Sequence, residues 1–373
     1  MHATPMKKDP CLYELRASNI PINQIGPLHP NARILISTHV DDFVTVNNNH
    51  MVREYFKSQL SNYFTWRETT GEKILGFEVM KIPDYVEVKM TSYIEDFIEK
   101  FDLDYLQPAQ VPIAPSQYIE YRNQYVMELS EKGLPMGIKK FQEILGCLTY
   151  IAFGTMMEIK NAIRMIAPYA TKPSPLLWDI LLQIVRYVKG AKDNSVKYYD
   201  TQGDNSITAY SDASNAMEPK GYSALGTTIM MFGGPIITAS RTNSDVYTHS
   251  FASELEAIEQ TMEETIQFQE LIEDLHPQQI PINLYNDNKA AVTFGNGEGT
   301  KPFKVHHIRT KFLKIQDLVR KKKFRLIHMP NSRLFTDIYT KVLGPKKFKK
   351  FRESLKRSNF PKSILKIKSK KKK

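Results

Sequence analysis

The alternation of hydrophobic and polar residues divides the chain into three sections. In the first section, residues 1 to about 105, short apolar and β-branched runs indicate strands. A helical period follows, because the apolar residues of 92–101 recur at spacings of three and four. The expected strands are residues 33–40, 74–81 and 86–90, and the apolar face of the helix comprises Ile94, Phe97, Ile98 and Phe101. This section is predicted to be mixed α and β.

The second section, from about 106 to 203, is dominated by the helical period. It opens with a proline-bearing connection at 106–115, and two long apolar stripes follow at 137–154 and 176–190. The first stripe consists of Phe141, Ile144, Leu145 and Leu148. Such stripes are typical of helices that pack on one another, so they predict a helical region rather than a ligand site.

The third section, from 204 to about 345, has three strand-like runs in succession and then alternates helical and strand-like segments. This order predicts one mixed five-stranded sheet with helices packed on it, and hence an α/β (α+β) fold. The expected strands are 206–214, 224–232, 234–242, 281–288 and 324–330, and the expected helices are 253–275, 289–295, 306–323 and 333–343. The apolar face of the longest helix comprises Leu255, Ile258, Met262, Ile266 and Leu275.

Length and composition are those of a globular protein. A chain of 373 residues is expected to hold two or more domains. Its two cysteines, Cys11 and Cys147, form neither a metal-finger spacing nor a disulfide framework, which predicts an intracellular protein. The first residues lack the apolar core of a signal peptide, and no apolar run reaches the roughly 20 residues needed to span a bilayer. Membrane insertion is therefore not expected.

The positive charge is concentrated at the C-terminal end. Residues 346–373 carry 14 Lys and Arg against the single Glu353, and because the whole chain has a net charge of +11, the remainder is slightly negative at −2. Such a segment is predicted to be disordered, and a solvated tail is one interpretation of it. Attraction to nucleic acid, or a nuclear localisation signal, is the other, because dense Lys and Arg gain affinity by releasing phosphate counterions.

Four acidic residues of the third section lie where strands end and helices begin. Asp212 and Asp287 come at the ends of expected strands, and Glu254 and Asp337 lie early in expected helices. Each alone has an ordinary explanation in turn formation or the helix dipole. Brought together at one sheet edge they would repel one another, unless divalent cations lay between them. Two Mg²⁺ ions about 4 Å apart can activate water and stabilise the leaving oxygen of a phosphodiester.

The order of the blocks YSDAS, SELEAI, YNDNKAA and FTDIYTK resembles the ribonuclease H domain of copia-type LTR retrotransposon polyproteins. The resemblance implies that Asp212, Glu254, Asp287 and Asp337 are catalytic and bind two Mg²⁺ ions, for which Mn²⁺ can substitute. It also implies a metal-dependent endoribonuclease that hydrolyses the RNA strand of RNA/DNA hybrids. Glu254 suits the catalytic position better than Glu256, because it keeps the spacing to the TIQF segment.

The first half of the chain resembles the reverse transcriptase of the same elements. The residues HVDD, 39–42, resemble its aspartate-bearing hairpin, and blocks such as ILGFEVMK and FQEILGCLTYIA follow in the family's order. The resemblance implies that Asp41 is the principal polymerase metal ligand and Asp42 a weaker one. The third palm aspartate and the fingers would precede this sequence, so the polymerase site is incomplete. We therefore expect no RNA-directed DNA polymerase activity from this chain alone unless the missing segment is supplied in trans.

The expected organisation follows from these resemblances. It is a partial reverse-transcriptase palm (1–105), a helical thumb and connection region (106–203), a ribonuclease H-like domain (204–345) and a basic, disordered tail (346–373). The cluster Arg320, Lys321, Lys322 and Lys323 at the end of the basic helix is a candidate grip on a hybrid backbone, and a solvated helix end is the equal alternative.

Three hypotheses for function remain open. The first is the ribonuclease H enzyme; the second is a catalytically dead retroelement relic that at most binds nucleic acid; the third is a general Mg²⁺ nuclease of the same superfamily. The resemblance further implies a location in the cytoplasmic virus-like particle, together with other element-encoded proteins, and the lysine-rich tail adds a candidate nuclear signal.

Overall fold

The computed structural model describes residues 3–21, 29–124, 137–201, 204–215, 221–247, 249–273, 275, 280–298 and 306–356. Contacts divide the chain into two compact units. One comprises Met1–Glu72 with Gln267–Pro277, and the other comprises Lys73–Ile266 with Gln278–Lys373. The contacts therefore separate the chain after Glu72, whereas the domain boundary at residue 105 stays a prediction. No helix in the described part of the chain is both long and apolar enough to cross a bilayer.

The first unit is built on an antiparallel sheet in the order β1-β2-β3-β4. Its strands are β1 (Thr4–Pro5), β2 (Leu12–Arg16), β3 (Arg33–His39) and β4 (Asp42–Asn47), and α2 (His50–Ser61) follows them. Asn49 caps α2, because its side chain accepts hydrogen bonds from the backbone of Met51 and Val52. Val52, Phe56 and Leu60 on one face of α2 pack with Leu15 and Ile34 from the sheet. This small core holds the β3–β4 hairpin in place.

The second unit contains the helical section and a second antiparallel sheet, in the order β5-β6-β7-β8. These strands are β5 (Lys73–Ile74), β6 (Phe77–Ile82), β7 (Tyr85–Lys89) and β8 (Val196–Tyr199). The helices are α3 (Thr91–Lys100), α4 (Pro115–Gln124), α5 (Gly137–Gly154), α6 (Lys160–Ile166) and α7 (Pro175–Gly190), with short 3-10 turns at Met157–Ile159 and Ala167–Tyr169. The apolar stripes expected at 92–101, 137–154 and 176–190 are all buried, so the helix predictions for these segments are confirmed.

The mixed five-stranded sheet predicted for the third section is confirmed, in the order β11-β10-β9-β12-β13. Its strands are β9 (Thr208–Ser214), β10 (Ala224–Met231), β11 (Gly234–Thr242), β12 (Ile282–Asn286) and β13 (Phe324–His328). The first three pair antiparallel, whereas β12 runs parallel to both β9 and β13. The carboxyl ends of β9 and β12 therefore point to the same edge of the sheet.

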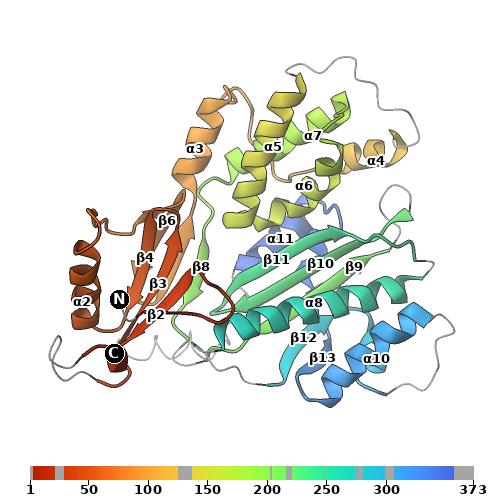
Figure 1. Cartoon of the computed structure of the whole chain (residues 1–373). Helices are drawn as coiled ribbons and strands as arrows, with labels where there is room; N and C mark the ends of the chain where they lie inside the picture. Colours follow the sequence, from red (N-terminus) through yellow and green to blue (C-terminus); the bar gives the residue numbers. More distant parts are fainter. Residues whose placement is uncertain are drawn as a thin grey trace, which may run out of the picture. The chain divides into compact units, whose positions relative to one another are not determined.

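Helices cover this sheet, as Figure 1 shows, with α8 running across one face and α11 lying behind the strands. The elements that follow the first three strands are α8 (Ser250–Ile272), α9 (Lys289–Gly295), α10 (His306–Arg320), the 3-10 helix η5 (Phe335–Tyr339) and α11 (Pro345–Lys356). Lys311 and Lys314 of α10 form ion pairs with Glu256 and Glu259 of α8, so these two helices are joined by charge. The helix expected over 333–343 is instead this short 3-10 turn.

One hydrophobic core runs through the second unit. It joins residues of the helical section, such as Trp178 and Ile184, to residues of the third section, such as Tyr210 and Ile338. The two sections also meet through strands, because the Tyr199 amide donates to the Phe232 carbonyl and the Tyr198 hydroxyl donates to the Pro235 carbonyl at 2.9 Å. The predicted helical and ribonuclease H-like sections therefore fold as one unit.

The prediction that the segment from residue 346 onward is disordered is wrong for its first part. Residues 345–356 form α11, and Phe348, Phe351 and Leu355 on one side of it are buried in the core of the second unit. These three apolar residues recur at helical spacing between the lysines, and their burial stabilises the helix. The rest of the predicted tail, 357–373, lies outside the described residues.

Substituting Phe351→Ala tests whether α11 belongs to the core. Phe351 is 1% exposed, so its truncation should lower the free energy of unfolding by about 3–5 kcal/mol. Lys349→Ala, on the exposed side of the same helix, should change it by less than about 0.5 kcal/mol. Chemical denaturation of both variants measures the difference, and equal stability of the two would mean that the helix is not packed.

Candidate metal centre

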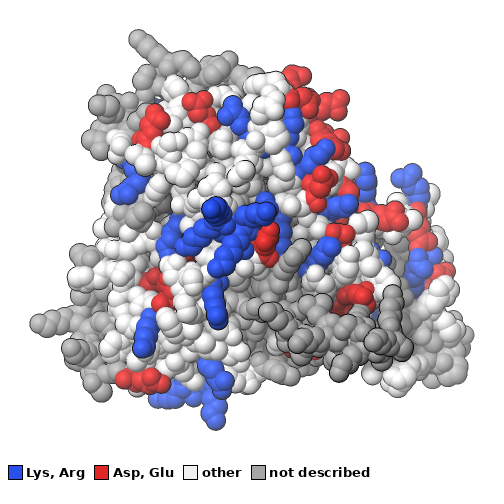
Figure 2. All heavy atoms as spheres, turned by 180° about the vertical axis from the view of Figure 1, so that it is seen from behind, with Lys and Arg blue, Asp and Glu red and all other residues white. Residues whose placement is uncertain are grey.

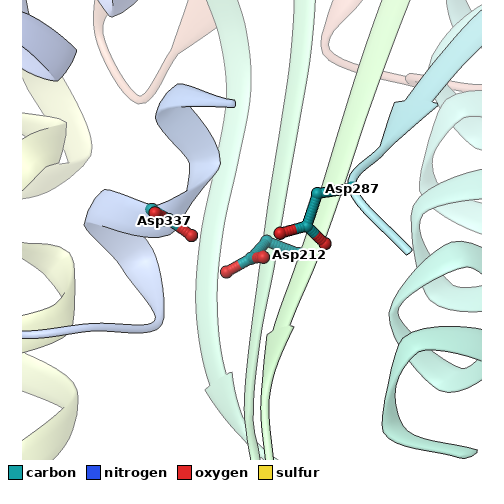
Figure 3. Close-up of side chains that lie close together, drawn as sticks. All are labelled: Asp212, Asp287 and Asp337. Carbon is teal, nitrogen blue, oxygen red and sulfur yellow. The ribbon is translucent and has the colours of Figure 1, made fainter. Parts of the chain in front are cut away.

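Three of the four predicted carboxylates meet at one edge of the five-stranded sheet. Asp212 comes from β9, Asp287 follows the last residue of β12, and Asp337 lies in η5. One carboxylate oxygen of each lies within 4.8 Å of the others. Figure 3 shows the three carboxylates directed toward one another from these separate elements. Residues separated by up to 125 positions in the chain are thus assembled into one cluster.

The parallel register of β9 and β12 places the first two acids at the same level. Tyr210 of β9 pairs with Tyr285 of β12, and their rings stack with centroids 5.1 Å apart. Asp212 and Asp287 each lie two residues beyond this pair. Because side chains two residues apart lie on the same face of a strand, both acids project from the same side of the sheet edge. Asp212 itself lies within β9 rather than at its end, where the sequence places it.

Gly226 allows η5 to approach the sheet closely enough to bring Asp337 to Asp212. It lies in β10 directly opposite Asp212. A Cβ atom at this position would lie 3.0 Å from the Thr340 methyl group, 3.1 Å from the Thr336 methyl group and 3.2 Å from the Thr336 carbonyl oxygen. Any larger side chain would push η5 away from the sheet. The cluster therefore requires glycine at this position.

Asparagines on both sides of Asp287 hold its backbone. The Asn286 side-chain oxygen accepts from the Asn288 amide at 2.8 Å, and the Asn288 side chain caps α9 by accepting from Ala291 at 3.0 Å. The Asp287 carboxylate accepts a hydrogen bond from Asn331 Nδ2 at 3.1 Å. The turn that carries Asp287 is therefore fixed from three directions.

Glu254, the fourth predicted carboxylate, lies beside the three aspartates but not among them. The sequence predicts Glu254 in the first turn of the helix, whereas in the structure it lies in the second turn of α8. Its side chain is buried, with 5% of the residue exposed. Its Oε2 accepts from Asn286 Nδ2 at 2.8 Å, and the same amide donates to Ser211. Asn286, which is fully buried, thus joins α8 to β9 and β12 just behind the cluster.

Glu256, the alternative to Glu254, has a different environment. Its carboxylate accepts hydrogen bonds from the Tyr247 hydroxyl at 2.9 Å and the Gln260 amide at 3.0 Å, and it forms an ion pair with Lys311. These contacts engage Glu256 in joining α8 to α10. Its pKa is lowered despite burial, because Lys311 and the two hydrogen bonds stabilise the charged form.

The buried acids of the cluster have raised pKa values. Burial, opposed by Lys341 and reinforced by the charges of Asp337 and Asp287, raises the pKa of Asp212 to about 7. Burial and the nearby Asp212 also raise the pKa of Glu254 well above its usual range. Such shifts show that negative charge at this position is poorly solvated, and an added cation would relieve it.

Two lysines that sequence analysis did not select supply positive charge to the cluster. Lys341 Nζ lies 3.4 Å from Asp212 Oδ1 and also contacts Asp337 Oδ1. Lys347, from the first turns of α11, lies 2.6 Å from Asp337 Oδ2. Burial opposes the charge of Lys341, but the surrounding acids raise its pKa. The available signal for Lys341 was its position four residues after Asp337, which places both side chains on one side of a helical turn.

The residues of the cluster fit a divalent metal of the hard, oxygen-binding kind. Three carboxylates with mutually close oxygens are the ligands preferred by Mg²⁺ and Mn²⁺, and no cysteine or histidine joins them among the residues that the structure describes. Asp212 is fully buried, which requires a compensating cation; here Lys341 fills that role. The three carboxylates can therefore bind a metal ion, which would displace the ammonium groups of Lys341 and Lys347 from them.

The predicted polymerase acids lie at the tip of the β3–β4 hairpin. His39 pairs with Asp42, and the turn between the strands consists of Val40 and Asp41, with Val40 at a φ of +52°. Asp41 and Asp42 are both exposed, and no third metal-ligating side chain joins them in the described ranges. Asp41 thus lies in the turn and Asp42 is the first residue of β4, so neither lies in the interior of a strand.

The basic cluster at the end of α10 is exposed but partly neutralised. Arg320 and Lys321 each lie 2.6 Å from a carboxylate oxygen of Asp317. Lys322, at a φ of +56°, and Lys323 follow in the turn to β13. Whether Arg320, Lys321, Lys322 and Lys323 bind nucleic acid stays a prediction.

Comparison with known proteins connects these features. No model of a protein family matches the chain. The Ty1-JR2 Gag-Pol polyprotein of Saccharomyces cerevisiae is 22% identical over 332 residues, which cover 86% of this chain and 19% of that protein. The yeast TyH3 Gag-Pol polyprotein matches to the same extent. The chain is therefore similar to yeast Ty1-type Gag-Pol polyproteins over most of its own length. It spans about a fifth of the length of these Gag-Pol relatives.

The solved structures to which part of this chain is similar are ribonucleases H. LC11-RNase H1, isolated from compost, is 19% identical, with a TM-score of 0.30, and the similarity covers 36% of this chain and 93% of that one. The same enzyme in complex with an RNA/DNA hybrid gives a TM-score of 0.27 over 34% of this chain and 88% of that one, also at 19% identity. The N-terminal ribonuclease H domain of a Mycobacterium tuberculosis protein is 12% identical, with a TM-score of 0.29, over 40% of this chain and 99% of that one.

Asp212→Asn should stabilise the metal-free chain, and the gain should grow with pH. The folded state raises the pKa of Asp212 to about 7, so it binds the proton more tightly than the unfolded state, and the free energy of unfolding falls as pH rises from about 4 to about 7. Asparagine does not ionise, so the variant should not lose stability in this way. Above pH 7 we expect its free energy of unfolding to exceed that of the unaltered chain by roughly 1–3 kcal/mol. Denaturation in EDTA at pH 5 and pH 8 measures it. A variant no more stable than the unaltered chain at pH 8 would contradict the raised pKa.

Gly226→Val should disrupt the approach of η5 to the sheet. The added side chain meets Thr336 and Thr340, so we expect the free energy of unfolding to fall by about 1–3 kcal/mol, with weaker binding of Mn²⁺. Gly146→Val, in the exposed middle of α5 with no neighbour within 4 Å of its added Cβ atom, is the matched control and should be neutral or slightly stabilising. Thermal unfolding and Mn²⁺ titration report the two effects, and equal behaviour of the two variants would exclude the steric argument.

Proposed function

We propose that this chain is a metal-dependent ribonuclease H that hydrolyses the RNA strand of RNA/DNA hybrids. The observation that carries the proposal is the convergence of Asp212, Asp287 and Asp337, from β9, the residue after β12 and η5, with one carboxylate oxygen of each within 4.8 Å of the others. The block order that resembles copia-type ribonuclease H domains and the similarity to Gag-Pol polyproteins support it. The complex of LC11-RNase H1 with an RNA/DNA hybrid suggests the substrate class.

The proposed mechanism assigns roles to the chain's own residues. Asp212, Asp287, Asp337 and Glu254 would hold the cations. A pair of Mg²⁺ or Mn²⁺ ions supplies Lewis acidity that activates water and stabilises the leaving oxygen of a phosphodiester. Asn286 orients Glu254, and Asn331 orients Asp287, through hydrogen bonds of 2.8 and 3.1 Å. In the metal-free chain, Lys341 and Lys347 offset the negative charge of Asp212 and Asp337. This reduces the repulsion between the carboxylates.

The polymerase section has a narrower role in this proposal. Asp41 and Asp42, at the tip of the β3–β4 hairpin, would contribute two ligands to a polymerase site. DNA synthesis, the presence of other element-encoded proteins as partners, the location in a particle and the nuclear role of the lysine-rich segment all stay predictions. A general Mg²⁺ nuclease would share the acids, and it is distinguished by its substrate range.

The decisive experiment compares Glu254→Gln with Glu256→Gln on a hybrid whose RNA strand is labelled. Glu254 lies against the cluster, whereas Glu256 is engaged by Lys311 and Tyr247, so the two substitutions are chemically identical but structurally distinct. We expect cutting of the RNA strand with Mg²⁺, a loss of roughly 100-fold or more in Glu254→Gln and in Asp212→Asn, and retention within a few fold in Glu256→Gln.

Single-stranded RNA and duplex DNA serve as substrate controls, and circular dichroism confirms that each variant is folded. Cutting of all substrates alike would favour the general nuclease. If well-folded chain cuts no hybrid with either Mg²⁺ or Mn²⁺, the proposal fails and the protein at most binds nucleic acid.

A further inference from the structure

Helix α11 presents a row of lysines on the side that faces away from the core. Between residues 345 and 356 it carries six Lys and Arg residues against the single Glu353. Lys346, Lys349 and Lys350 are exposed, while Phe348, Phe351 and Leu355 are buried beneath them. In Figure 2 the Lys and Arg side chains gather in the middle of this side of the molecule, where α11 lies. The lysine row is therefore held in place by an apolar anchor.

Through Lys347, the lysines of α11 reach the carboxylate cluster. Lys347 Nζ lies 2.6 Å from Asp337 Oδ2 and 3.1 Å from Asn331 Oδ1, and Asn331 in turn donates to Asp287. Lys350 donates to the Ser332 carbonyl at 2.8 Å, so α11 also holds the loop that carries Asn331. A backbone phosphate that reaches the carboxylates would thus have the lysines of α11 as its neighbours.

Electrostatics favours this surface over the basic end of α10. Arg320 and Lys321 share the carboxylate of Asp317, which offsets one positive charge. Lys346 and Lys349 have no acidic partner within 4 Å among residues 3–356 that the structure describes. The two remaining cations of α11 point inward, since Arg352 contacts the Tyr187 hydroxyl and Lys356 lies 3.3 Å from Glu158. The exposed lysines thus retain their charge for an external anion.

We propose that Lys346, Lys347, Lys349 and Lys350 of α11, the α11 lysine row, hold the phosphate backbone of the nucleic acid next to the carboxylates. A cluster of carboxylates repels a phosphodiester, so a neighbouring row of cations is needed to draw the strand in. Contacts to phosphates position a nucleic acid without reading its sequence, which suits a surface of flexible lysines. The proposal rests on the function proposed above in its choice of ligand, an RNA/DNA hybrid.

The test measures binding without cleavage. The full chain, in EDTA, is titrated into a fluorescent RNA/DNA hybrid at several salt concentrations, and anisotropy reports the Kd. The variant carries Lys346→Gln, Lys349→Gln and Lys350→Gln, and leaves Lys347 intact because it contacts Asp337. The control carries Lys321→Gln, Lys322→Gln and Lys323→Gln, which removes the same charge from the end of α10. Both retain residues 357–373, so any contribution from that segment is common to the two.

We expect the α11 variant to bind about tenfold more weakly at moderate salt, with the slope of log Kd against log salt reduced by roughly 3. The control should bind within about twofold of the unaltered chain. Equal losses in both variants, a loss in the control alone, or no loss in either would overturn the proposal. Thermal unfolding of both variants should stay close to that of the unaltered chain, because all six lysines are exposed and each variant loses one surface contact, that of Lys350 with the Ser332 carbonyl or that of Lys321 with Asp317.

The two proposals fail in different ways. If the hybrid is bound through α11 but is not cut with Mg²⁺, the enzyme proposal fails and the α11 lysine row stands. If the hybrid is cut and the α11 variant keeps both its affinity and its salt dependence, the lysine row fails and the enzyme stands. A second arm with a polyglutamate peptide tests simple anion binding, and equal affinity for peptide and hybrid would overturn the assignment to nucleic acid.

Discussion

Repulsion between buried carboxylates is the constraint on which the rest of the site depends. Asp212 and Asp337 are fully inaccessible to solvent, so their charges cannot be screened by water. The sheet, η5 and α11 hold the acids together, and Lys341 and Lys347 offset their charge. Packing elsewhere must supply the free energy that this arrangement costs, which explains why the acids are surrounded by a large apolar core. The carboxylate cluster thus lowers the stability of the fold, and the apolar core around it compensates.

Much of the fold follows from periodicity alone, because strands and buried helices leave clear patterns. The five strands of the mixed sheet and helices α3, α5 and α7 match the expected ranges closely. The pattern fails where few residues decide the outcome. In α11, the many lysines led to a prediction of disorder, although the three apolar residues among them recur at helical spacing. Around Asp337 the sequence predicts an α-helix over 333–343, but the segment that lies against Gly226 of the sheet is the short 3-10 turn η5.

The acids of the site could be predicted, but the residues that arrange them could not. Motif order identified Asp212, Asp287 and Asp337, because carboxylates at strand ends have a chemical reason to converge. Gly226 gave no signal of its own, since its role depends on a register with β9 and an approach by η5 that are tertiary facts. Lys347 was assigned to a tail, and only the fold shows that it reaches a carboxylate. Long-range contacts thus limit what a single sequence can reveal.

The continuous core of the second unit has a consequence for autonomy. Leu334 and Ile338, which lie on either side of Asp337 in the sequence, pack in the same cluster as Trp178 and Val185 of helix α7. A fragment cut at the expected boundary near residue 204 would lose that partner surface and expose these side chains to water. Residues 204–356 therefore depend on the preceding helices for part of their core, and a change in helix α7 would be transmitted to the carboxylate cluster through shared packing.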